Sequence, residues 1–365
     1  MKKTIISLFL IVFASMPVFA DTGTAAMPFL KLGGGARGAA LGGAFSAIAD
    51  DSTSVFYNPA ATVFLDRKEV AFSHSLWLED MSLEHISYAQ PLSPYMSAMF
   101  GAAALRSGSM RSYDEAGVSG GSFSAMDVAV SGGISYIVSQ RFYAGAQVKL
   151  FSQSADSDSA RSLGADLGAV IRGDILRYSV SVLNLGSDIR LGSYAFSLPR
   201  TIRAGVSKEL FSGFRGSAEY INYVDSGSQF AAGAEYRIRI RPDDDLQALS
   251  LRVGYYGGHD KNTGSGISGG VGFRTSDLSL DYAFTPYGDL GSAHRFTLSL
   301  AFGESRENMR ETYDYHYRSR EENRRQSENK LFKKGQDRVA DMPTFDGLDE
   351  YKPEKEDKKI RDFNW

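Results

Sequence analysis

Residues 142–150 read FYAGAQVKL, and the alternation in this short stretch decides the fold. Every second residue from Phe142 onward is apolar, and the residues between them include Gly145, Gln147 and Lys149. Successive side chains of a β-strand point to opposite faces. The stretch therefore predicts a strand with one apolar face and one small or polar face.

Similar runs with a period of two recur between residues 68 and 303. About 14 of them can be counted, and many are about 10 residues long, the length with which a tilted strand crosses a bilayer. An even number fits a barrel whose two ends lie on one side of the membrane. We expect strands at residues 68–77, 81–90, 95–106, 122–138, 141–153, 160–173, 175–184, 199–208, 214–223, 228–239, 247–257, 265–274, 277–285 and 293–303.

A soluble β-sandwich would show the same alternation, because one face of each sheet is buried. Two features favour a transmembrane barrel. The runs are many for one sandwich, and their less apolar face carries Gly, Ala and Ser more than Lys and Glu. We predict an all-β fold: a 14-stranded antiparallel transmembrane β-barrel over residues 67–303.

The connections between the runs alternate in length. Short ones, such as 139–140 and 173–174, contrast with longer ones at 107–121, 186–198 and 258–264. Outer-membrane barrels have tight periplasmic turns and longer outer loops, so both termini are expected in the periplasm. Aromatic residues near strand ends are expected to form interfacial girdles: Tyr143, Phe151, Tyr178, Tyr220, Tyr223, Tyr255, Tyr256 and Phe273.

The first 20 residues have the pattern of a secretory signal peptide. Lys2 and Lys3 precede an apolar run at 5–12, and the small-residue pattern at 18–20 precedes Asp21. A membrane anchor is the alternative, but the run is short. No later stretch approaches the roughly 20 apolar residues that a spanning helix needs. We expect export to the bacterial outer membrane.

The sequence of residues 21–66 predicts a hatch, or plug, inside the barrel. A Gly-rich segment at 33–38 leads into 39–49, where Leu41, Phe45 and Ile48 recur at helical spacing. Turns are expected at 50–51 and 58–60. The small residues would let this helix pack closely against the barrel wall.

Residues 304–365 form a highly charged tail in which the two signs nearly balance. With few apolar residues the tail cannot bury a core of its own. We expect a periplasmic segment, helical near its start or disordered, that acts as a solvated spacer or binds a periplasmic partner.

The alternation also places charged side chains in the predicted lumen, where charges at bilayer depth are tolerated. Contacts Arg203–Glu219 and Glu235–Arg252 are expected, with Arg37 and Asp50 or Asp51 docking on them. Such a network can be a gate or a static filling of the wall. Its six wall members are Arg203, Glu219, Glu235, Arg252, Arg274 and Asp281.

Several classes of function are disfavoured. The chain has no Cys and five scattered His, so no metal site is expected. A net charge of −3 argues against nucleic-acid binding. The glycine spacing at 33–38 matches a dinucleotide fingerprint formally, but the preceding strand is missing. No catalytic triad appears, so we expect neither an enzyme nor a cofactor.

The segment 29–65 resembles the N-terminal signature of the PorV/PorQ family of outer-membrane proteins, which is related to FadL-type transporters of hydrophobic compounds. The sequences at 182–186 and 198–207 are also similar to that family. The charged tail departs from the pattern. The residues that carry the resemblance are Gly34, Ala36, Arg37, Gly38, Gly43, Ala44, Ala47, Asp50, Asp51, Asn58, Pro59 and Ala60.

The resemblance implies a 14-stranded barrel with an N-terminal hatch, and it leaves two functions open. One is a FadL-like barrel that binds hydrophobic small molecules and passes them inward. The other is a PorV-like docking platform in a type IX-like secretion or surface-attachment system. A purely structural outer-membrane protein is a further alternative. An apolar pocket that opens outward would favour transport, and a sealed lumen with structured outer loops would favour docking.

Overall fold

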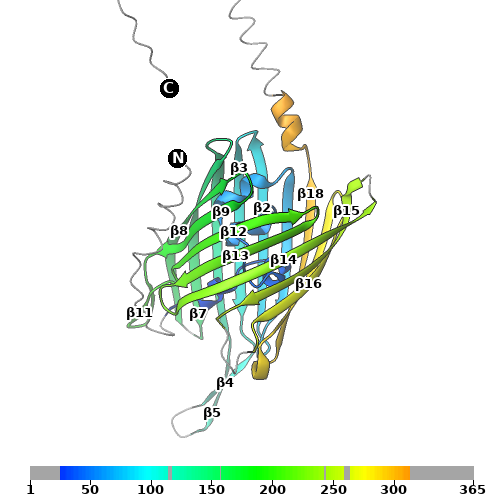
Figure 1. Ribbon diagram of the computed structural model, residues 1–365. Coiled ribbons are helices and arrows are strands. Elements are labelled where there is room, and N and C mark those ends of the chain that lie inside the picture. The colour runs from blue at the N-terminus through cyan, green and yellow to red at the C-terminus, as the bar shows by residue number, and fades with distance from the viewer. Residues whose placement is uncertain (1–24, 114–116, 157, 242–243, 259–263, 313–365) are drawn as a thin grey trace, which may run out of the picture. The chain divides into compact units, whose positions relative to one another are not determined.

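Fourteen antiparallel strands close into one barrel (Figure 1), as the period-two runs predict. The computed structural model describes residues 25–113, 117–156, 158–241, 244–258 and 264–312. Each barrel strand pairs with its neighbours in chain order, and the last strand pairs with the first. The barrel strands are β1 (Lys68–Leu76), β2 (Ser82–Ser93), β3 (Met96–Arg106), β6 (Ala125–Ile137), β7 (Phe142–Ala155), β8 (Asp158–Arg172), β9 (Arg177–Gly186), β12 (Thr201–Phe211), β13 (Phe214–Tyr223), β14 (Gly227–Arg241), β15 (Asp244–Tyr256), β16 (Ile267–Arg274), β17 (Leu278–Pro286) and β18 (Ser292–Phe302).

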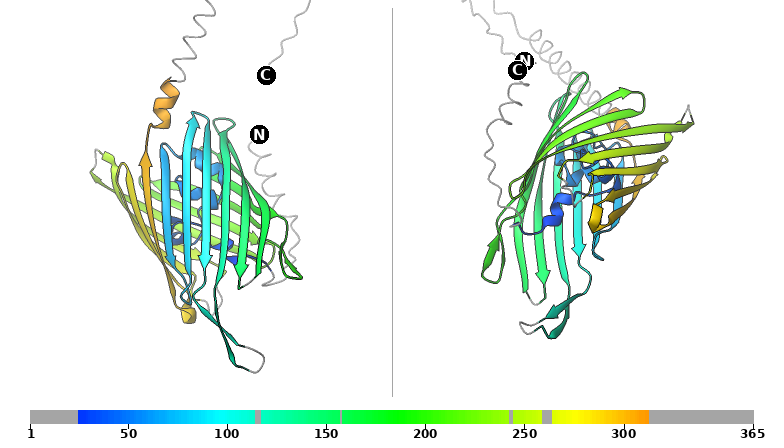
Figure 2. Two further views of the ribbon diagram at one scale, coloured as in Figure 1. Left: turned by 180° about the vertical axis from the view of Figure 1, so that it is seen from behind. Right: turned by 60° about the horizontal axis from the view of Figure 1, so that its bottom comes forward.

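Two of the expected long loops contain hairpins of their own. Strands β4 (Met110–Tyr113) and β5 (Ser119–Phe123) pair in the connection after β3. Strands β10 (Ile189–Leu191) and β11 (Tyr194–Phe196) pair in the connection after β9. We call the end of the barrel that carries these hairpins the loop end and the opposite end the turn end; Figure 2 shows both from behind.

The outer face of the wall is apolar. Side chains that a soluble protein would bury are exposed here: Val148 to 69%, Leu150 to 60% and Leu163 to 62%. A sandwich buries its apolar face in its core, so the structure excludes that alternative. An apolar belt on the outside of a closed barrel is the surface that lipid requires.

The inner face carries small polar residues. Buried serines such as Ser73, Ser87, Ser135 and Ser181 line the lumen. Tyr143, Phe151 and Tyr223 are also buried, at 5%, 2% and 4% exposure, so the prediction that they form an interfacial girdle is wrong. Their sequence parity is that of the inward residues on their strands, and parity decides the face.

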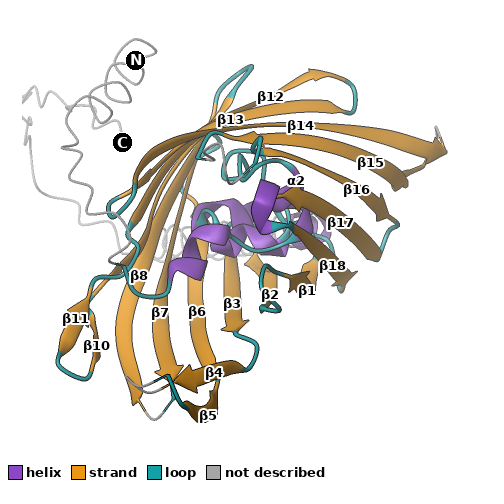
Figure 3. Cartoon of the chain, turned by 90° about the horizontal axis from the view of Figure 1, so that it is seen from below, coloured by secondary structure: helices purple, strands orange, loops and turns teal. Residues whose placement is uncertain are grey.

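Residues 25–66, the inner segment, lie inside the ring of strands; Figure 3 shows the short helices there. They are η1 (Pro28–Leu32), α2 (Ala36–Ala40), η2 (Ser52–Phe56) and η3 (Pro59–Phe64). The continuous helix expected over 39–49 is wrong, because Gly42 and Gly43 have φ angles of 64° and 82° and end it. Leu41, Phe45 and Ile48 still pack in one cluster.

Among the described residues, no helix has the length and apolarity needed to cross a membrane. The predicted signal peptide, residues 1–20, lies outside the described residues, and so does the tail from 313 onward. Residues 306–312 are helical. Arg306 is buried and donates to the backbone oxygens of Leu65 and Ser93 and to Ser97 Oγ, which joins this helix to the turn end.

Candidate functional site

Glu235 on β14 is the centre of an ion-pair network between the inner segment and the wall. Arg37 of α2 donates two hydrogen bonds to the carboxylate of Glu235, from Nε to Oε2 at 2.8 Å and from Nη2 to Oε1 at 3.0 Å. Arg252 on β15 donates from Nε to Oε2 at 2.8 Å. Glu235 is fully buried. Paired and forked contacts of this kind are the geometry in which a buried carboxylate is well compensated.

Asp50 and Asp51 occupy the other side of Arg37. Its Nη1 donates to Asp50 Oδ1 at 2.5 Å and to Asp51 Oδ2 at 2.8 Å. Asp50 also accepts from Arg215 Nη1 at 2.8 Å. Asp51 has a structural task as well, because its Oδ1 accepts from Thr53 N at 3.0 Å and caps η2.

The neighbouring charges shift the pKa values of both Arg37 and Asp50. Burial alone would raise the pKa of Asp50, but Arg37 and Arg215 outweigh it, and the pKa lies well below its usual range. Burial likewise opposes the charge of Arg37, yet Asp50, Glu235 and Asp51 raise its pKa well above the ordinary value. Both groups therefore stay charged at neutral pH.

The remaining predicted wall charges fall into two groups. Arg203 Nε donates to Glu219 Oε1 at 2.5 Å, and its Nη2 donates to the Gly43 backbone oxygen at 2.6 Å. Arg252 Nη1 donates to Asp281 Oδ1 at 2.6 Å. Arg274, although half-buried, forms no ion pair within 4 Å with any residue the structure describes. The structure thus brings five of the six wall charges into pairs.

Sequence reasoning missed Arg215 and Arg237, which approach Glu235 at 3.6 and 3.9 Å. The signal was present in the alternation. Arg215 has the parity of Glu219 on β13, and Arg237 has the parity of Glu235 on β14. Arg215 is the second residue of β13, whereas Arg237 lies well inside β14, so alternation alone could have identified it.

The glycines of the predicted hatch motif permit close contacts. A side chain at Gly33 or Gly38 would overlap the Tyr57 ring, and one at Gly34 would overlap Phe56. Gly42 approaches the backbone of β15 so closely that neither it nor Gly254 has room for a Cβ atom. The Gly-rich loop therefore folds over two aromatic rings and lies against the wall.

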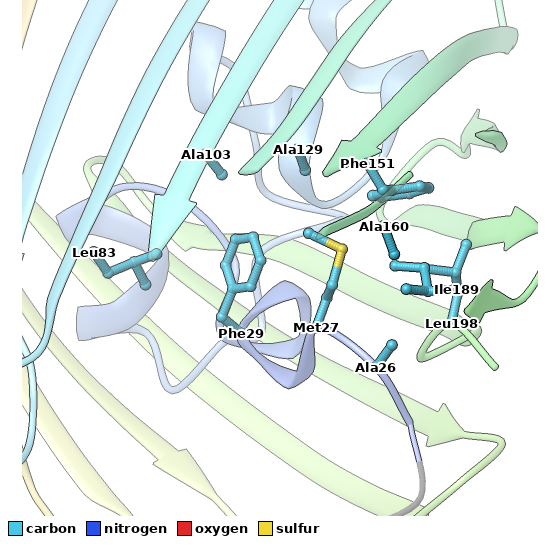
Figure 4. Close-up of a cluster of buried hydrophobic side chains, with 10 residues drawn as sticks. All are labelled: Ala26, Met27, Phe29, Leu83, Ala103, Ala129, Phe151, Ala160, Ile189 and Leu198. Atoms are coloured by element: carbon cyan, nitrogen blue, oxygen red, sulfur yellow. The ribbon is translucent and has the colours of Figure 1, made fainter. Parts of the chain in front are cut away.

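Asn58, Pro59 and Ala60 attach the inner segment to the opposite wall. Asn58 Oδ1 accepts from Ala60 N at 3.0 Å and caps η3. Its Nδ2 donates to the backbone oxygens of Ala169 and Val180 at 3.2 and 3.3 Å. The start of the segment packs into a further apolar cluster near the loop end, with Met27 and Phe29 in its middle (Figure 4).

A cavity of about 280 Å³ lies at the loop end, between the inner segment and the wall. Its lining is mainly aromatic and aliphatic and includes Trp77, Tyr256, Tyr287 and Ile221. Trp77 and Tyr287 meet edge to face at 5.1 Å. Cavities that bind small molecules combine apolar walls with a few convergent polar groups, so this is the candidate ligand site.

The polar groups of the cavity are basic. Lys31, Arg203 and Arg295 line it, together with Tyr57, and no acidic residue does. Sequence reasoning did not select Arg295 or Tyr57. Arg295 has the parity of the polar face of its strand, so alternation alone could have placed it inside, whereas nothing in the sequence singled out Tyr57.

No group of three or more His, Cys, Asp or Glu side chains that could hold a metal ion exists within the part of the chain that the structure describes. The carboxylates Asp50, Glu219, Glu235 and Asp281 pair with arginine, and Asp166 pairs with Lys149. The chemistry of the described lumen is that of charge pairing and apolar contact.

The closed 14-stranded barrel with an occupied lumen defines a class of fold, and comparison with solved structures gives relatives within it. The Pseudomonas putida toluene transporter TodX is 12% identical with a TM-score of 0.50; the alignment covers 78% of this chain and 98% of that one. The CymD monoaromatic hydrocarbon channel is 13% identical with a TM-score of 0.51, covering 75% and 98%. The chain shares the fold of these two channels.

A Pseudomonas aeruginosa FadL homologue is also similar, at 15% identity, a TM-score of 0.46 and coverage of 79% and 99%. The sequence profile of an uncharacterised protein family, UPF0164, matches residues 19–168, which is less than half of the chain. No curated protein matches the sequence. The resemblance to the PorV/PorQ family remains a prediction.

Proposed function

We propose that this protein is an outer-membrane channel that admits small apolar molecules through the cavity at its loop end. The observation that carries the proposal is an aromatic-lined cavity between the barrel wall and the segment that occupies its lumen. The apolar belt suits lipid, and the occupied lumen would deny passage to bulk solutes.

The size of the cavity limits the ligand. Water occupies about 30 Å³ per molecule in the liquid, so 280 Å³ corresponds to about nine waters or to a compound with one aromatic ring. Sites for drug-sized ligands begin near 300 Å³. The names of the fold relatives TodX and CymD refer to toluene and to monoaromatic hydrocarbons, which agrees with this size.

The ion-pair network supplies the gate in this proposal. Arg37 joins the inner segment to Glu235 on β14, and Arg203 joins Gly43 to β12. A molecule that passes beyond the cavity must displace part of this segment. Because the partners of Arg37 are all charged, local displacement separates charges and is rare without a ligand.

A binding and transport experiment tests the proposal. Ala293 lines the cavity, and Ala293→Trp should fill it, whereas Val148→Trp on the lipid face is the matched control. The unaltered protein and the control should bind 4-fluorotoluene in ¹⁹F NMR and pass toluene across bilayers with a lipopolysaccharide outer leaflet. The filled variant should do neither. Equal transport by all three proteins would contradict the proposal.

The second candidate is a docking role for the charged tail. The buried Arg306 ties the first turn of the tail helix to the turn end of the barrel, so the start of the tail is fixed there. Deletion of residues 313–365 leaves this anchor intact. We expect the deletion to preserve toluene transport and to abolish co-purification of a periplasmic protein; unchanged co-purification would dismiss this role.

A further inference from the structure

Two residues that line the cavity, Tyr57 and Arg295, have polar groups that the fold leaves incompletely satisfied. Tyr57 is 1% exposed, and its hydroxyl has no hydrogen-bond partner in the described structure. A buried hydroxyl without a partner costs about 1–3 kcal/mol. A group kept at such a cost in the wall of a cavity is a candidate for ligand recognition.

Arg295 is the second such group. It is 4% exposed, and its Nε donates to Ser75 Oγ at 2.7 Å. Its Nη1 points to the backbone oxygens of the Gly-rich loop, the shortest contact being 3.1 Å to Gly33. Among the described residues, no carboxylate lies within 4 Å of its guanidinium, and no hydrogen bond uses Nη2. A buried cation usually has a charged partner.

The other two cations of the cavity are already neutralised. Lys31 Nζ lies 2.5 Å from Asp225 Oδ2, and Arg203 Nε lies 2.5 Å from Glu219 Oε1. The lining therefore retains one uncompensated positive charge, that of Arg295. The Tyr57 hydroxyl lies beneath the Gly-rich loop, against Gly33 and Gly38, and burial raises the pKa of Tyr57 to about 12 and keeps this donor protonated.

Both groups are fixed by the same loop. Arg295 binds the Gly33 and Gly35 oxygens, while the Tyr57 ring packs against Gly33 and Gly38. Arg203 lies over the Tyr57 ring, 5.2 Å from its centre. The donors are thus held rigidly beside the aromatic walls, which reduces the entropy lost when a ligand binds.

We propose that the cavity selects small aromatic carboxylates: the ring lies among Trp77, Tyr256 and Tyr287, and the carboxylate binds Arg295 and the Tyr57 hydroxyl. This rests on the proposed channel function and changes its preferred substrate from a neutral aromatic ring to a ring that carries a carboxylate. A neutral hydrocarbon would fill the apolar part but leave both donors unsatisfied. A cation would meet Arg295 and be rejected.

Binding of three compounds that share one ring tests the assignment. In ¹⁹F NMR titrations of the full-length protein in detergent, 4-fluorobenzoate should bind at least about tenfold more tightly than 4-fluorotoluene. 4-Fluorobenzylammonium should bind most weakly. Saturable binding that decreases when the cavity is filled by Ala293→Trp locates the ligand.

Tyr57→Phe is the decisive variant, because the hydroxyl has no protein hydrogen bond to lose. We expect it to fold and to weaken 4-fluorobenzoate binding by about tenfold, with 4-fluorotoluene binding unchanged within about twofold. Tyr143→Phe is the matched control. It also removes a hydroxyl from a buried tyrosine, but that hydroxyl donates to the Gln140 oxygen at the turn end.

The outcomes separate the two levels of the proposal. If 4-fluorotoluene binds and 4-fluorobenzoate does not, the carboxylate assignment fails and the channel proposal stands. If neither binds, both fail. If 4-fluorobenzoate binds but Tyr57→Phe leaves its affinity unchanged, the carboxylate lies elsewhere and the inference is overturned.

Discussion

Glu235→Gln should loosen the inner segment without removing a side chain from the lumen. The amide is nearly isosteric with the carboxylate, so packing is kept and only charge and one acceptor change. Oε2 accepts two bonds, from Arg37 and Arg252, and Oε1 accepts one, from Arg37. The amide oxygen should therefore take the Oε2 position, which turns the NH₂ group toward Arg37 Nη2.

The expected cost follows from this geometry. Loss of one charge-assisted bond is worth about 1.5–3 kcal/mol, and a broken buried pair costs about 3–5 kcal/mol. Arg37 keeps Asp50 and Asp51, and Arg252 keeps Asp281, so neither cation is left unpaired. We therefore expect the free energy of unfolding to fall by about 3 kcal/mol, the lower limit for a broken buried pair.

The assay is a double-mutant cycle with Arg37→Met. The protein is unfolded by guanidinium in detergent micelles, and the fraction that remains folded is measured by its resistance to SDS. Linear extrapolation to zero denaturant gives the free energy of unfolding. We expect a coupling energy of about 2–3 kcal/mol between positions 37 and 235. A coupling near zero would refute the reasoning, because the two side chains would then not share a bond in the folded protein.

Permeation through the same variant separates a gate from a static network. If the Arg37–Glu235 contact holds the lumen closed, Glu235→Gln should increase arabinose entry in liposome swelling severalfold. The lipid-facing Val148→Trp variant should leave it unchanged. Lower stability with unaltered permeation would assign the network to structure alone.

Three further predictions concern the inner segment. Because the pKa of Asp50 is held well below its usual range, its stabilisation is complete above about pH 5 and is lost as the pH falls through the native pKa; stability measured from pH 5 to 2 should decline less in Asp50→Asn. Gly254→Ala should destabilise the barrel by about 1–3 kcal/mol, because its Cβ would meet the backbone of the inner segment, while Gly269→Ala, with its nearest atom at 3.7 Å, should be nearly neutral in the same unfolding assay. Asn58→Ala loses a cap and two bonds to strand carbonyls and should cost about 1–3 kcal/mol, seen also as faster hydrogen exchange of residues 59–64 by mass spectrometry.

Alternation along the strands predicted much of this molecule. It placed Glu235 and Arg252 on one face of adjacent strands, and the register makes them direct partners. The same rule assigns Tyr143 and Tyr223 to the lumen, where the structure has them, so parity decides their face although they lie near strand ends. The parity of a residue identifies the face of the strand that it occupies but not its position along the barrel axis. Arg215, at the start of β13, was missed for this reason.

The inner segment was less predictable because its conformation depends on the wall. Helical spacing over 39–49 correctly grouped Leu41 with Phe45, but the positive φ angles of Gly42 and Gly43 break the helix. Gly42 lies directly against the backbone of β15, a long-range contact that leaves no room for a side chain. The cavity forms where the segment meets six strands, β12, β13 and β15 to β18, and no local pattern encodes such a meeting.

The central claim is that residues 25–66 occupy the lumen, and cross-linking tests it most directly. The chain has no Cys, so introduced pairs report without background. Ser46 and Ser179 lie with their Oγ atoms 2.7 Å apart, and Ser52 and Ser87 lie 2.9 Å apart. Both Cys pairs should oxidise nearly completely in the folded barrel, while a pair at 46 and 87, on contacts separated by four strands, should not. Absence of both disulfides in correctly folded protein would contradict the account.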